Sequence, residues 1–328
     1  MAKTDQKPLL EVRNLKTYFY TEDGVVSAVD GVSFEVYPGE VLGIVGESGC
    51  GKSVTALSIL GLISNPGNIE GGEVLFNGKD LIKAKKKEIS AIRGNELSMI
   101  FQEPMSSLNP LMTIGKQIIE PLMEHKKLYK IEAFEMAVEL IKKMGISRAE
   151  EIMYCYPHEL SGGMLQRIMI AIALSCNPKL LIADEPTTAL DVTIQAQILD
   201  LLNGLKDESS MSILLITHDL GVVAEVADYV IVMYAGKIIE EAPVLELFKN
   251  HKHPYTKGLL KAKPVLGHRT ERLYTIEGNV PNLSDLKPSC YFSDRCPECM
   301  EVCRRKAPTL QSIENNHKIA CWLYEEEN

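Results

Sequence analysis

One short segment has the residue types and spacing needed to bind phosphate. Residues 46–53 read GESGCGKS, which fits the pattern Gly-x-x-x-x-Gly-Lys-Ser/Thr. The glycines let consecutive backbone N–H groups turn toward phosphate oxygens at the start of a helix, whose dipole favours an anion. Lys52 supplies a positive charge for the outer phosphates, and the Ser53 hydroxyl can bind Mg²⁺. An apolar stretch precedes the segment and a helical pattern follows it, so we predict a phosphate loop between a strand and a helix.

Two adjacent carboxylates, Asp184 and Glu185, end a second apolar stretch, LLIADE at residues 180–185. A strand there would bring both carboxylates to the sheet edge beside the phosphate loop. Asp184 can then hold Mg²⁺ through water, and Glu185 can orient or deprotonate an attacking water. Taken alone, such a pair more often marks a turn. Together with the phosphate loop, it indicates metal-assisted chemistry on phosphate.

A third segment, LSGGM at residues 160–164, places Ser161, Gly162 and Gly163 directly before an apolar helical pattern. The simplest interpretation is a serine N-cap. The functional interpretation is an exposed helix N-terminus that binds a γ-phosphate held by another chain. The residues alone do not choose between the two.

The cysteines are unevenly distributed, because five of the eight lie in the last 39 residues, at positions 290, 296, 299, 303 and 321. A reducing compartment would favour a metal site over disulfides. Four thiolates suit either tetrahedral zinc or an iron–sulfur cluster, and the spacing does not decide between them. Reduced thiols are the third alternative. So short a segment cannot build its own core, so a bound metal or cluster would organise it.

Apolar runs alternate with helical patterns up to about residue 248, as expected for a sheet covered by helices. Continuous apolar runs predict strands at residues 9–12, 32–36, 41–45, 73–76, 99–101, 180–183, 212–217 and 229–234. Helical periodicity predicts helices at residues 52–62, 131–144, 162–175, 194–208 and 221–227. The basic run at residues 83–87 is typical of a solvated loop.

The pattern changes near residue 250. Residues 251–260 still have a helical pattern, but residues 263–289 contain Pro, Gly and Asn breaks that predict a linker or an irregular wall. We therefore predict a first domain at residues 1–250, with a helical subdomain at roughly 103–176, and a C-terminal extension at residues 251–328.

Composition narrows the class of protein. With 328 residues, 45% hydrophobic and 24% charged, the chain should be globular. Its net charge of −9 weighs against non-specific binding to nucleic acid, which needs a basic surface. No run of apolar residues is long enough for a membrane span, and the start lacks a secretory signal, so we expect neither a membrane-spanning nor an exported chain.

Together, these motifs resemble the ATP-binding-cassette (ABC) ATPase family over nearly the whole chain. Residues 46–53 resemble its Walker A loop, residues 180–185 its Walker B strand and residues 160–164 its signature sequence. The resemblance implies an α/β fold, a P-loop NTPase of the ABC type. Such a fold has a mixed-sheet core and a helical subdomain, here followed by a small irregular cysteine-rich C-terminal extension.

The resemblance also implies the site residues. Gln102 resembles the Q-loop glutamine and His218 the switch histidine, and with Glu185 these would be catalytic. Asp191 resembles the D-loop aspartate, and Phe19 the aromatic residue that stacks on adenine. The residues implied to hold Mg²⁺ are Ser53, Gln102 and Asp184. The implied ATP-binding set is Phe19, Gly46, Glu47, Ser48, Gly49, Cys50, Gly51, Lys52, Ser53, Val54, Asp184, Ser161, Gly162, Gly163 and Asp191.

Further features resemble the ATP-binding subunits of dipeptide and oligopeptide importers. They are QEPMSSLNP at residues 102–110, the SGGM-x-QR form of the signature, HPYT at residues 253–256 and the terminal cysteines. Leu165 departs from this resemblance, because these subunits usually carry Arg there. In this family, cysteines at the positions of Cys290, Cys296, Cys303 and Cys321 imply a [4Fe–4S] cluster, with zinc as the alternative and Cys299 as a spare thiol.

The implied function is to bind and hydrolyse ATP and so to energise the import of dipeptides or oligopeptides. ATP would lie between Walker A and B of one subunit and the signature of its partner. The implied partners are a homologous ATP-binding subunit, two transmembrane permease subunits and, indirectly, an extracytoplasmic peptide-binding protein, with no nucleic acid. The implied location is peripheral, on the cytoplasmic face of the cell membrane.

The alternative function is that of a soluble ABC ATPase that acts on nucleic acid and carries a cysteine-bound metal. The acidic net charge weighs against it, as does the segment 267–328, which has 8 basic and 10 acidic side chains. A scaffold subunit without hydrolysis is disfavoured because Lys52, Asp184, Glu185 and His218 are all present.

Overall fold

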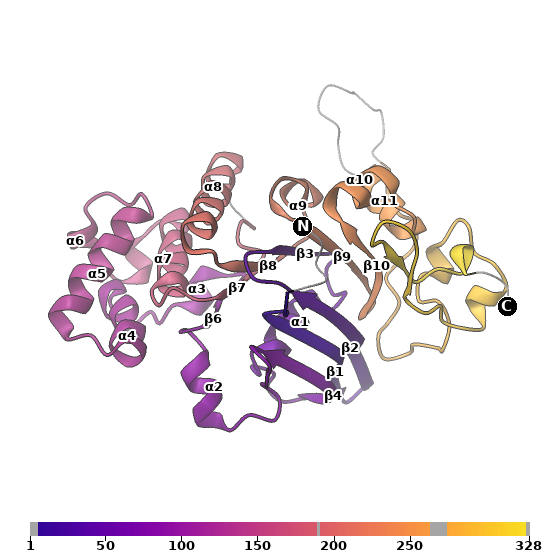
Figure 1. Ribbon diagram of the computed structural model, residues 1–328, viewed down its shortest axis with the longest axis horizontal. Coiled ribbons are helices and arrows are strands. Elements are labelled where there is room, and N and C mark those ends of the chain that lie inside the picture. The colour runs from indigo at the N-terminus through magenta and orange to yellow at the C-terminus, as the bar shows by residue number, and fades with distance from the viewer. Residues whose placement is uncertain (1–5, 189–190, 263–273, 326–328) are drawn as a thin grey trace. The chain divides into compact units, whose positions relative to one another are not determined.

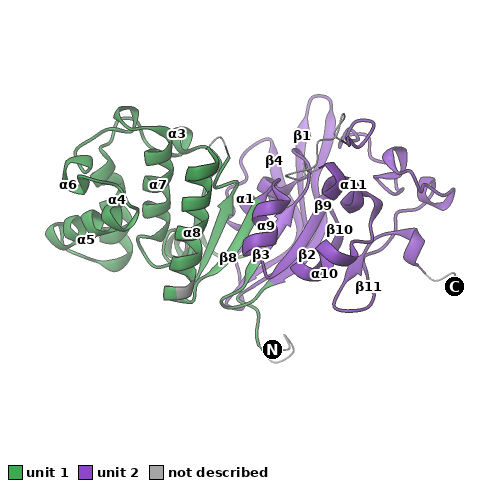
Figure 2. Ribbon diagram, turned by 90° about the horizontal axis from the view of Figure 1, so that it is seen from above, with its two compact units in different colours: residues 1–9, 36–41, 83–216 green, residues 10–35, 42–82, 217–328 purple. Residues whose placement is uncertain are grey.

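The computed structural model describes residues 6–188, 191–262 and 274–325, and these form two compact units (Figures 1 and 2). The first unit comprises residues 1–9, 36–41 and 83–216, and the second comprises residues 10–35, 42–82 and 217–328. The chain therefore passes between the units several times. The division at residue 250 that the sequence suggests stays a prediction.

The first unit is built on three parallel strands, and β7 lies between the other two. Every residue of these strands is buried, which explains why their sequences are continuous apolar runs. The strands are β6 (Leu97–Ile100), β7 (Leu180–Asp184) and β8 (Ser212–Thr217). The helices are α2 (Lys86–Ile92), α3 (Pro104–Ser107), α4 (Ile114–Lys126), α5 (Lys130–Lys143), α6 (Ala149–Ile152), η2 (Pro157–Glu159), α7 (Gly162–Leu174) and α8 (Val192–Ser209).

Helices α4, α5 and α7 pack together within this unit. Gly115 permits a close approach in α4, because a Cβ there would lie 2.6 Å from the carbonyl oxygen of Met153. The sequence analysis did not predict α4. Its interior contains Pro121, which removes a backbone donor and disfavours a helix, so the local sequence conceals a helix that tertiary packing stabilises.

The second unit contains an antiparallel sheet and a mixed group of strands. The antiparallel sheet has the order β2-β1-β4-β5, whereas β3 and β9 are parallel and β10, β12 and β11 continue antiparallel from β9. The strands are β1 (Leu10–Thr21), β2 (Gly24–Val36), β3 (Val41–Val45), β4 (Gly67–Phe76), β5 (Lys79–Asp80), β9 (Tyr229–Tyr234), β10 (Lys237–Pro243), β11 (Gln311–Ser312) and β12 (Lys318–Ile319). The helices are α1 (Lys52–Ile59), α9 (Leu220–Val226), α10 (Val244–Asn250) and α11 (Pro254–Ala262), with 3₁₀ turns η3 (Ser293–Arg295), η4 (Val302–Arg304) and η5 (Trp322–Tyr324).

Parallel strands, an antiparallel sheet and helices together confirm the predicted α/β class, while several local predictions need correction. Strands β1, β2 and β4 extend well beyond residues 9–12, 32–36 and 73–76. In β1, an irregularity between Arg13 and Lys16 interrupts the alternation without ending the strand. Helix α1 ends at Ile59 and not at the predicted residue 62. Gly61, just beyond its end, has a φ of 61°, a left-handed conformation that does not continue a helix. The basic run at 83–87 is only partly a loop, because Lys86 begins α2.

The C-terminal extension has short 3₁₀ turns and a two-residue pairing of β11 and β12 in its described part after residue 290. Part of the predicted linker, residues 263–273, lies outside the described residues. Within the described ranges, no helix combines the length and the apolar character needed to cross a bilayer.

A buried carboxylate anchors this extension to β10 within the second unit. Glu240 of β10 has no exposed surface and accepts hydrogen bonds from the backbone N–H groups of Lys252 (2.6 Å) and His253 (3.1 Å). It also contacts His317 Nε2 at 2.7 Å. Burial acts to raise the pKa of Glu240, but its hydrogen bonds, led by that from His317, leave the pKa below the ordinary value.

We expect His317→Ala to lower the free energy of unfolding by about 2 kcal/mol, since a buried carboxylate loses a partner. The contribution of ionised Glu240 is present above its ordinary pKa of 4.5 and is lost as the pH falls through the lower native value, so the variant should also show weaker pH dependence in this acid range. Urea unfolding between pH 3 and pH 7 measures both effects.

The matched control is Arg304→Met in the same extension, which removes an exposed pair with Asp294 and should cost less than about 1 kcal/mol. Equal stability of the His317→Ala variant and the wild type at neutral pH would contradict the anchoring role of Glu240.

Candidate functional site

The predicted phosphate loop follows β3 and leads into α1, as expected. Two of its glycines are required by close packing. A Cβ at Gly46 would lie 2.3 Å from the carbonyl oxygen of Met233, and one at Gly51 would lie 2.3 Å from the carbonyl oxygen of Ala28. Their φ angles, 154° and 101°, also favour glycine. Backbone atoms of β9 and β2 therefore fix both ends of the loop.

Lys52 is buried, and its side chain turns back over the loop. Its Nζ donates to the carbonyl oxygens of Gly46 (2.8 Å) and Glu47 (3.0 Å). Ser48 and Gly49 are exposed at the tip, and Ser53 and Val54 lie half-buried in the first turn of α1. The loop thus offers a cation and an exposed turn of backbone, which is the chemistry needed to hold phosphate oxygens.

Asp184 ends β7 in the first unit, and Glu185 follows it directly. Asp184 is buried, whereas Glu185 is half-buried and has a φ of 46°, which is uncommon for a residue other than glycine. The Glu185 carboxylate accepts hydrogen bonds from Gln102 Nε2 (3.1 Å) and the Thr188 hydroxyl (2.8 Å). Two predicted catalytic residues, Gln102 and Glu185, are therefore in direct contact. Thr188, which the sequence analysis did not select, orients the same carboxylate.

Two further predicted site residues, His218 and Phe19, lie in the second unit. His218 is exposed immediately after β8. Phe19 is half-buried in β1, with its ring packed on the site of Gly67 in β4, where a Cβ would lie 2.6 Å from the ring. Tyr20 is 49% exposed, so it is more accessible than Phe19. The adenine-stacking role of Phe19 stays a prediction.

Ser161 is the N-cap of α7, and its hydroxyl accepts a hydrogen bond from the N–H of Met164 at 3.4 Å. This agrees with the simpler interpretation of LSGGM as a serine cap. Ser161 and Gly162 are nevertheless exposed, so the helix N-terminus remains accessible and both interpretations fit. Asp191 caps α8 in the same manner, through Ile194 at 3.0 Å. Leu165 is buried in α7, which accounts for an apolar residue at that position.

The terminal cysteines form a compact group. Burial, and next the neighbouring thiols, raise the pKa of Cys290 to about 12 and that of Cys321 to about 11. The thiols that act on Cys290 belong to Cys296, Cys303 and Cys321, which are the residues that the sequence analysis selected. The backbone groups of Phe292, Glu298 and Leu323 act in the opposite direction, lowering the pKa of Cys290, Cys296 and Cys321, respectively.

These observations bear on which ions the chain can hold. Across residues 6–188, 191–262 and 274–325, no three His, Cys, Asp or Glu side chains are arranged to hold a metal ion. The four thiols still offer a donor set suited to iron or zinc. The hydroxyl of Ser53 and the buried carboxylate of Asp184 offer the hard oxygen donors that Mg²⁺ prefers.

Comparison with known proteins gives two family matches. Residues 29–188 match the family described as ABC transporter, and residues 239–303 match the C-terminal region of oligopeptide/dipeptide transporters. The chain is 56% identical to the oligopeptide transport ATP-binding protein AppD of Bacillus subtilis, over 97% of this chain and 98% of that protein. It is 50% identical to the oligopeptide transport ATP-binding protein OppD of Salmonella typhimurium, over 97% of this chain and 95% of that protein.

Solved structures give a consistent result. A dimeric ATP-binding cassette, MJ0796, in a post-hydrolysis state bound to ADP and Pi, is similar with a TM-score of 0.65 and 27% identity, over 72% of this chain and 98% of that one. The cbiO1 protein of Clostridium perfringens, part of an ABC transporter complex, is similar with a TM-score of 0.62 and 27% identity, over 75% of this chain and 92% of that one.

We expect Gly51→Ala to abolish detectable binding of a fluorescent ATP analogue, because the new Cβ meets the carbonyl oxygen of Ala28 and distorts the loop. The matched control is Gly71→Ala in β4, where a Cβ meets nothing within 4 Å and the wild-type affinity should persist. Fluorescence titration of the two variants decides the point. Normal binding by Gly51→Ala would contradict the assignment of residues 46–53 as the phosphate loop.

Proposed function

Because this chain belongs to the ABC transporter family, we propose that it is the subunit that binds and hydrolyses ATP to energise the import of dipeptides or oligopeptides. One observation carries the proposal. The similarity to oligopeptide transport ATP-binding proteins spans 97% of the chain, so it includes the C-terminal region as well as the ATP cassette. The proposed partners are a homologous ATP-binding subunit and two permeases, with an extracytoplasmic peptide-binding protein acting through them. The proposed location is the cytoplasmic face of the membrane, peripherally bound.

The phosphate loop is proposed to bind the β- and γ-phosphates of ATP. Lys52 would exchange its two loop carbonyl partners for phosphate oxygens, while the backbone N–H groups of residues 48–53 would surround the β-phosphate. Ser53, Asp184 and Gln102 would hold Mg²⁺, which supplies positive charge to neutralise the phosphates. Phe19 is proposed to contact the adenine base.

Glu185 is proposed to orient and deprotonate the water that attacks the γ-phosphate. Its carboxylate is already held by Gln102 and Thr188, so little reorganisation is needed when substrate arrives. His218 would contact the γ-phosphate from its exposed position after β8. A change at the γ-phosphate would therefore be transmitted to Gln102 through Glu185.

Two ATP sites would form between a pair of cassettes. The exposed N-terminus of α7, with Ser161, Gly162 and Gly163, would bind the γ-phosphate of the ATP held by the partner subunit. Asp191 lies at the start of the next helix, α8, and would act at the same interface. Closure on ATP and reopening after hydrolysis would drive the permeases between two states.

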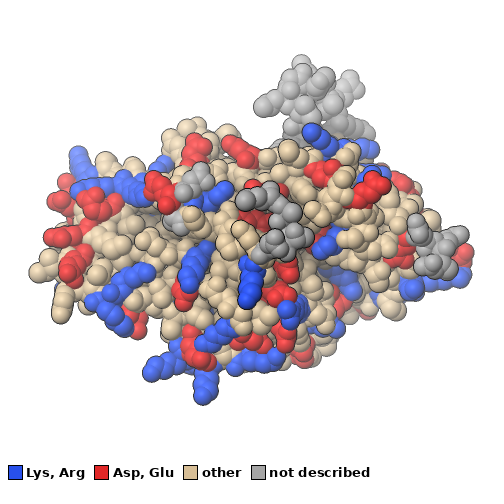
Figure 3. All heavy atoms as spheres, in the orientation of Figure 1, with Lys and Arg blue, Asp and Glu red and all other residues tan. Residues whose placement is uncertain are grey.

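The surface supports a protein partner over the alternative, an ABC ATPase acting on nucleic acid. On the face drawn in Figure 3, Lys and Arg side chains are interspersed with Asp and Glu side chains. A nucleic-acid interface instead concentrates basic side chains along one stripe. The net charge of −9 adds to this argument.

We also propose that Cys290, Cys296, Cys303 and Cys321 hold a [4Fe–4S] cluster, with zinc as the alternative. Support comes from the four-thiol donor set, whose members lie near enough to raise the pKa of Cys290. A cluster would stabilise a segment that has only short 3₁₀ turns and little core of its own.

We expect Glu185→Gln to bind ATP with wild-type affinity while its hydrolysis falls by about 100-fold or more, because the attacking water loses its base. Phosphate release by the assembled transporter measures hydrolysis, and equilibrium titration measures binding. The control is Glu96→Gln, a surface partner of Lys179. Undiminished turnover of Glu185→Gln would refute the role of Glu185.

A second experiment tests the shared site. Ser161→Arg should suppress ATP hydrolysis by the assembled complex, because a bulky side chain blocks the helix N-terminus that faces the partner's nucleotide. ATP binding by the isolated chain should be unchanged. Ser147→Arg, at an exposed position in the same unit, is the control. Normal ATPase activity of the assembled Ser161→Arg complex would contradict the shared site.

Metal analysis and the visible absorption spectrum after anaerobic purification test the cluster. We expect about four iron atoms per chain. Cys296→Ser should lose both iron and colour, whereas Cys299→Ser should retain them. A colourless protein that contains zinc and no iron would refute the [4Fe–4S] cluster and support zinc at these cysteines.

A further inference from the structure

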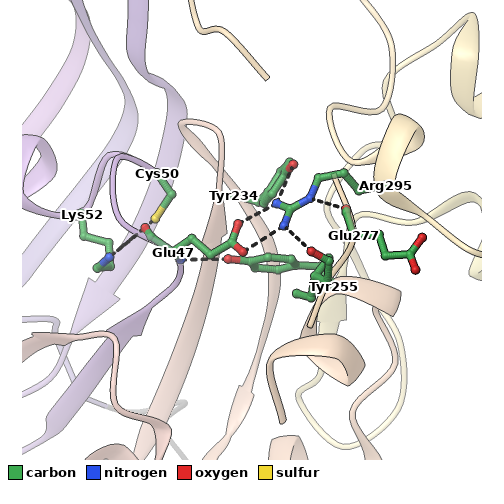
Figure 4. Close-up of polar contacts among 8 residues, drawn as sticks. Glu47, Cys50, Lys52, Tyr234, Tyr255, Glu277 and Arg295 are labelled. Atoms are coloured by element: carbon green, nitrogen blue, oxygen red, sulfur yellow. Dashed lines mark hydrogen bonds and ion pairs between the residues drawn. The ribbon is translucent and has the colours of Figure 1, made fainter. Parts of the chain in front are cut away.

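Glu47 of the phosphate loop is held from outside the loop by Arg295 (Figure 4). The two side chains form a bidentate pair, with Arg295 Nη1 2.7 Å from Glu47 Oε2 and Nη2 3.0 Å from Oε1. The Arg295 side chain is only 6% exposed and that of Glu47 is 27% exposed. This pair is therefore largely removed from solvent. By contrast, the nearby pairs of Arg304 with Asp294 and of Arg305 with Glu301 are exposed.

Every N–H group of the Arg295 guanidinium has an acceptor. Besides the two Glu47 oxygens, Nη1 donates to the Tyr234 hydroxyl (3.3 Å), Nη2 to the Ile276 carbonyl (3.4 Å) and Nε to the Glu277 carbonyl (3.1 Å). Five donors in a planar fork are used by five acceptors. A lysine cannot reproduce this arrangement, so the site specifically requires arginine.

The backbone of Glu47 is held as well. Its N–H donates to the hydroxyl of Tyr255 at 2.8 Å, and Tyr255 has no exposed surface. The Tyr255 ring packs edge-on against Tyr234 and Phe292, with centroid separations of 4.7 and 5.4 Å. Both the side chain and the amide of one loop residue are thus fixed by residues far along the chain.

Two of these contacts come from residues 290–321, which carry the terminal cysteines and are called the cysteine segment. Arg295 ends η3 and directly precedes Cys296, and Phe292 lies between Cys290 and η3. Residues 290–296 must therefore be folded as they are here for Arg295 to reach Glu47 and for Tyr255 to pack against Phe292.

The pair also matters for charge. A carboxylate in a loop that receives a triphosphate would repel the ligand unless it is neutralised. Arg295 neutralises Glu47, and because the pair is partly buried, the effect is less screened than at an open surface.

We propose that Arg295 and Tyr255 are positioning residues of the phosphate loop, through which the cysteine segment sets the affinity for ATP. The inference rests on the proposed function. It predicts a change in binding rather than in the chemical step, since neither residue is placed at the reacting atoms.

The test measures the dissociation constant for ATP of the purified full chain and the KM and kcat of the assembled transporter. Arg295→Met should raise both Kd and KM by about tenfold, the loss expected for a buried hydrogen bond to a charged group. Its kcat should stay within about twofold of the wild type, because the lost interaction is equally present in the ground state and the transition state.

Two readouts separate the loss of charge neutralisation at Glu47 from a general loss of structure. Glu47→Gln combined with Arg295→Met should recover most of the affinity, because the unpaired carboxylate is gone. The penalty of Arg295→Met should also be smaller for ADP than for ATP and should shrink at high salt, as repulsion requires. The control is Arg304→Met, whose exposed guanidinium pairs with Asp294 in the same segment and which should bind ATP normally.

Tyr255→Phe keeps the test decisive if Arg295→Met does not fold, since it retains the buried ring and removes only the acceptor for the Glu47 N–H. It should weaken ATP binding several-fold. Wild-type affinity in both variants, or no recovery in the double variant, would overturn the inference and leave the proposed function intact. A wild-type chain that binds no ATP would overturn the proposed function and this inference with it.

Discussion

The shape of the phosphate loop is the constraint on which the rest of this structure depends. At Gly46 and Gly51 the loop passes so close to the backbone of other elements that no side chain fits. The N–H of Gly236, just after β9, donates to the carbonyl of Cys50 at 3.0 Å, which fixes the middle of the loop as well. The glycines of the motif therefore permit the shape of the loop, and the backbones of β2 and β9, packed against Gly51 and Gly46, stabilise it.

The C-terminal extension is part of the same constraint. Glu240 joins β10 to the last hairpin through His317, and the aromatic group of Tyr234, Tyr255 and Phe292 joins β9 and α11 to the cysteine segment. Arg295 then connects that segment to Glu47. An irregular region with little secondary structure is thereby given a defined position relative to the loop within the second unit.

The sequence was sufficient for features that depend on neighbouring residues. Three of these features consist of consecutive residues: the phosphate loop, the Asp184–Glu185 pair and the Ser161 cap. The four cysteines are likewise grouped within one short segment. Features that depend on tertiary contacts were not predictable. The contact between Gln102 and Glu185 joins residues 83 positions apart, and that between Glu47 and Arg295 joins residues 248 positions apart. The left-handed backbone of Glu185 and the full length of β1 likewise follow from packing that no local pattern encodes.

The subunit composition of the native complex tests the central claim most directly. The chain would be tagged at its own locus, extracted in mild detergent with ATP and Mg²⁺, and its co-purifying macromolecules identified by mass spectrometry and nucleic-acid staining. We expect two membrane-spanning permease subunits and a second, homologous ATP-binding subunit in equimolar amounts. Recovery of the chain without any membrane protein, and with nucleic acid released by salt, would contradict it.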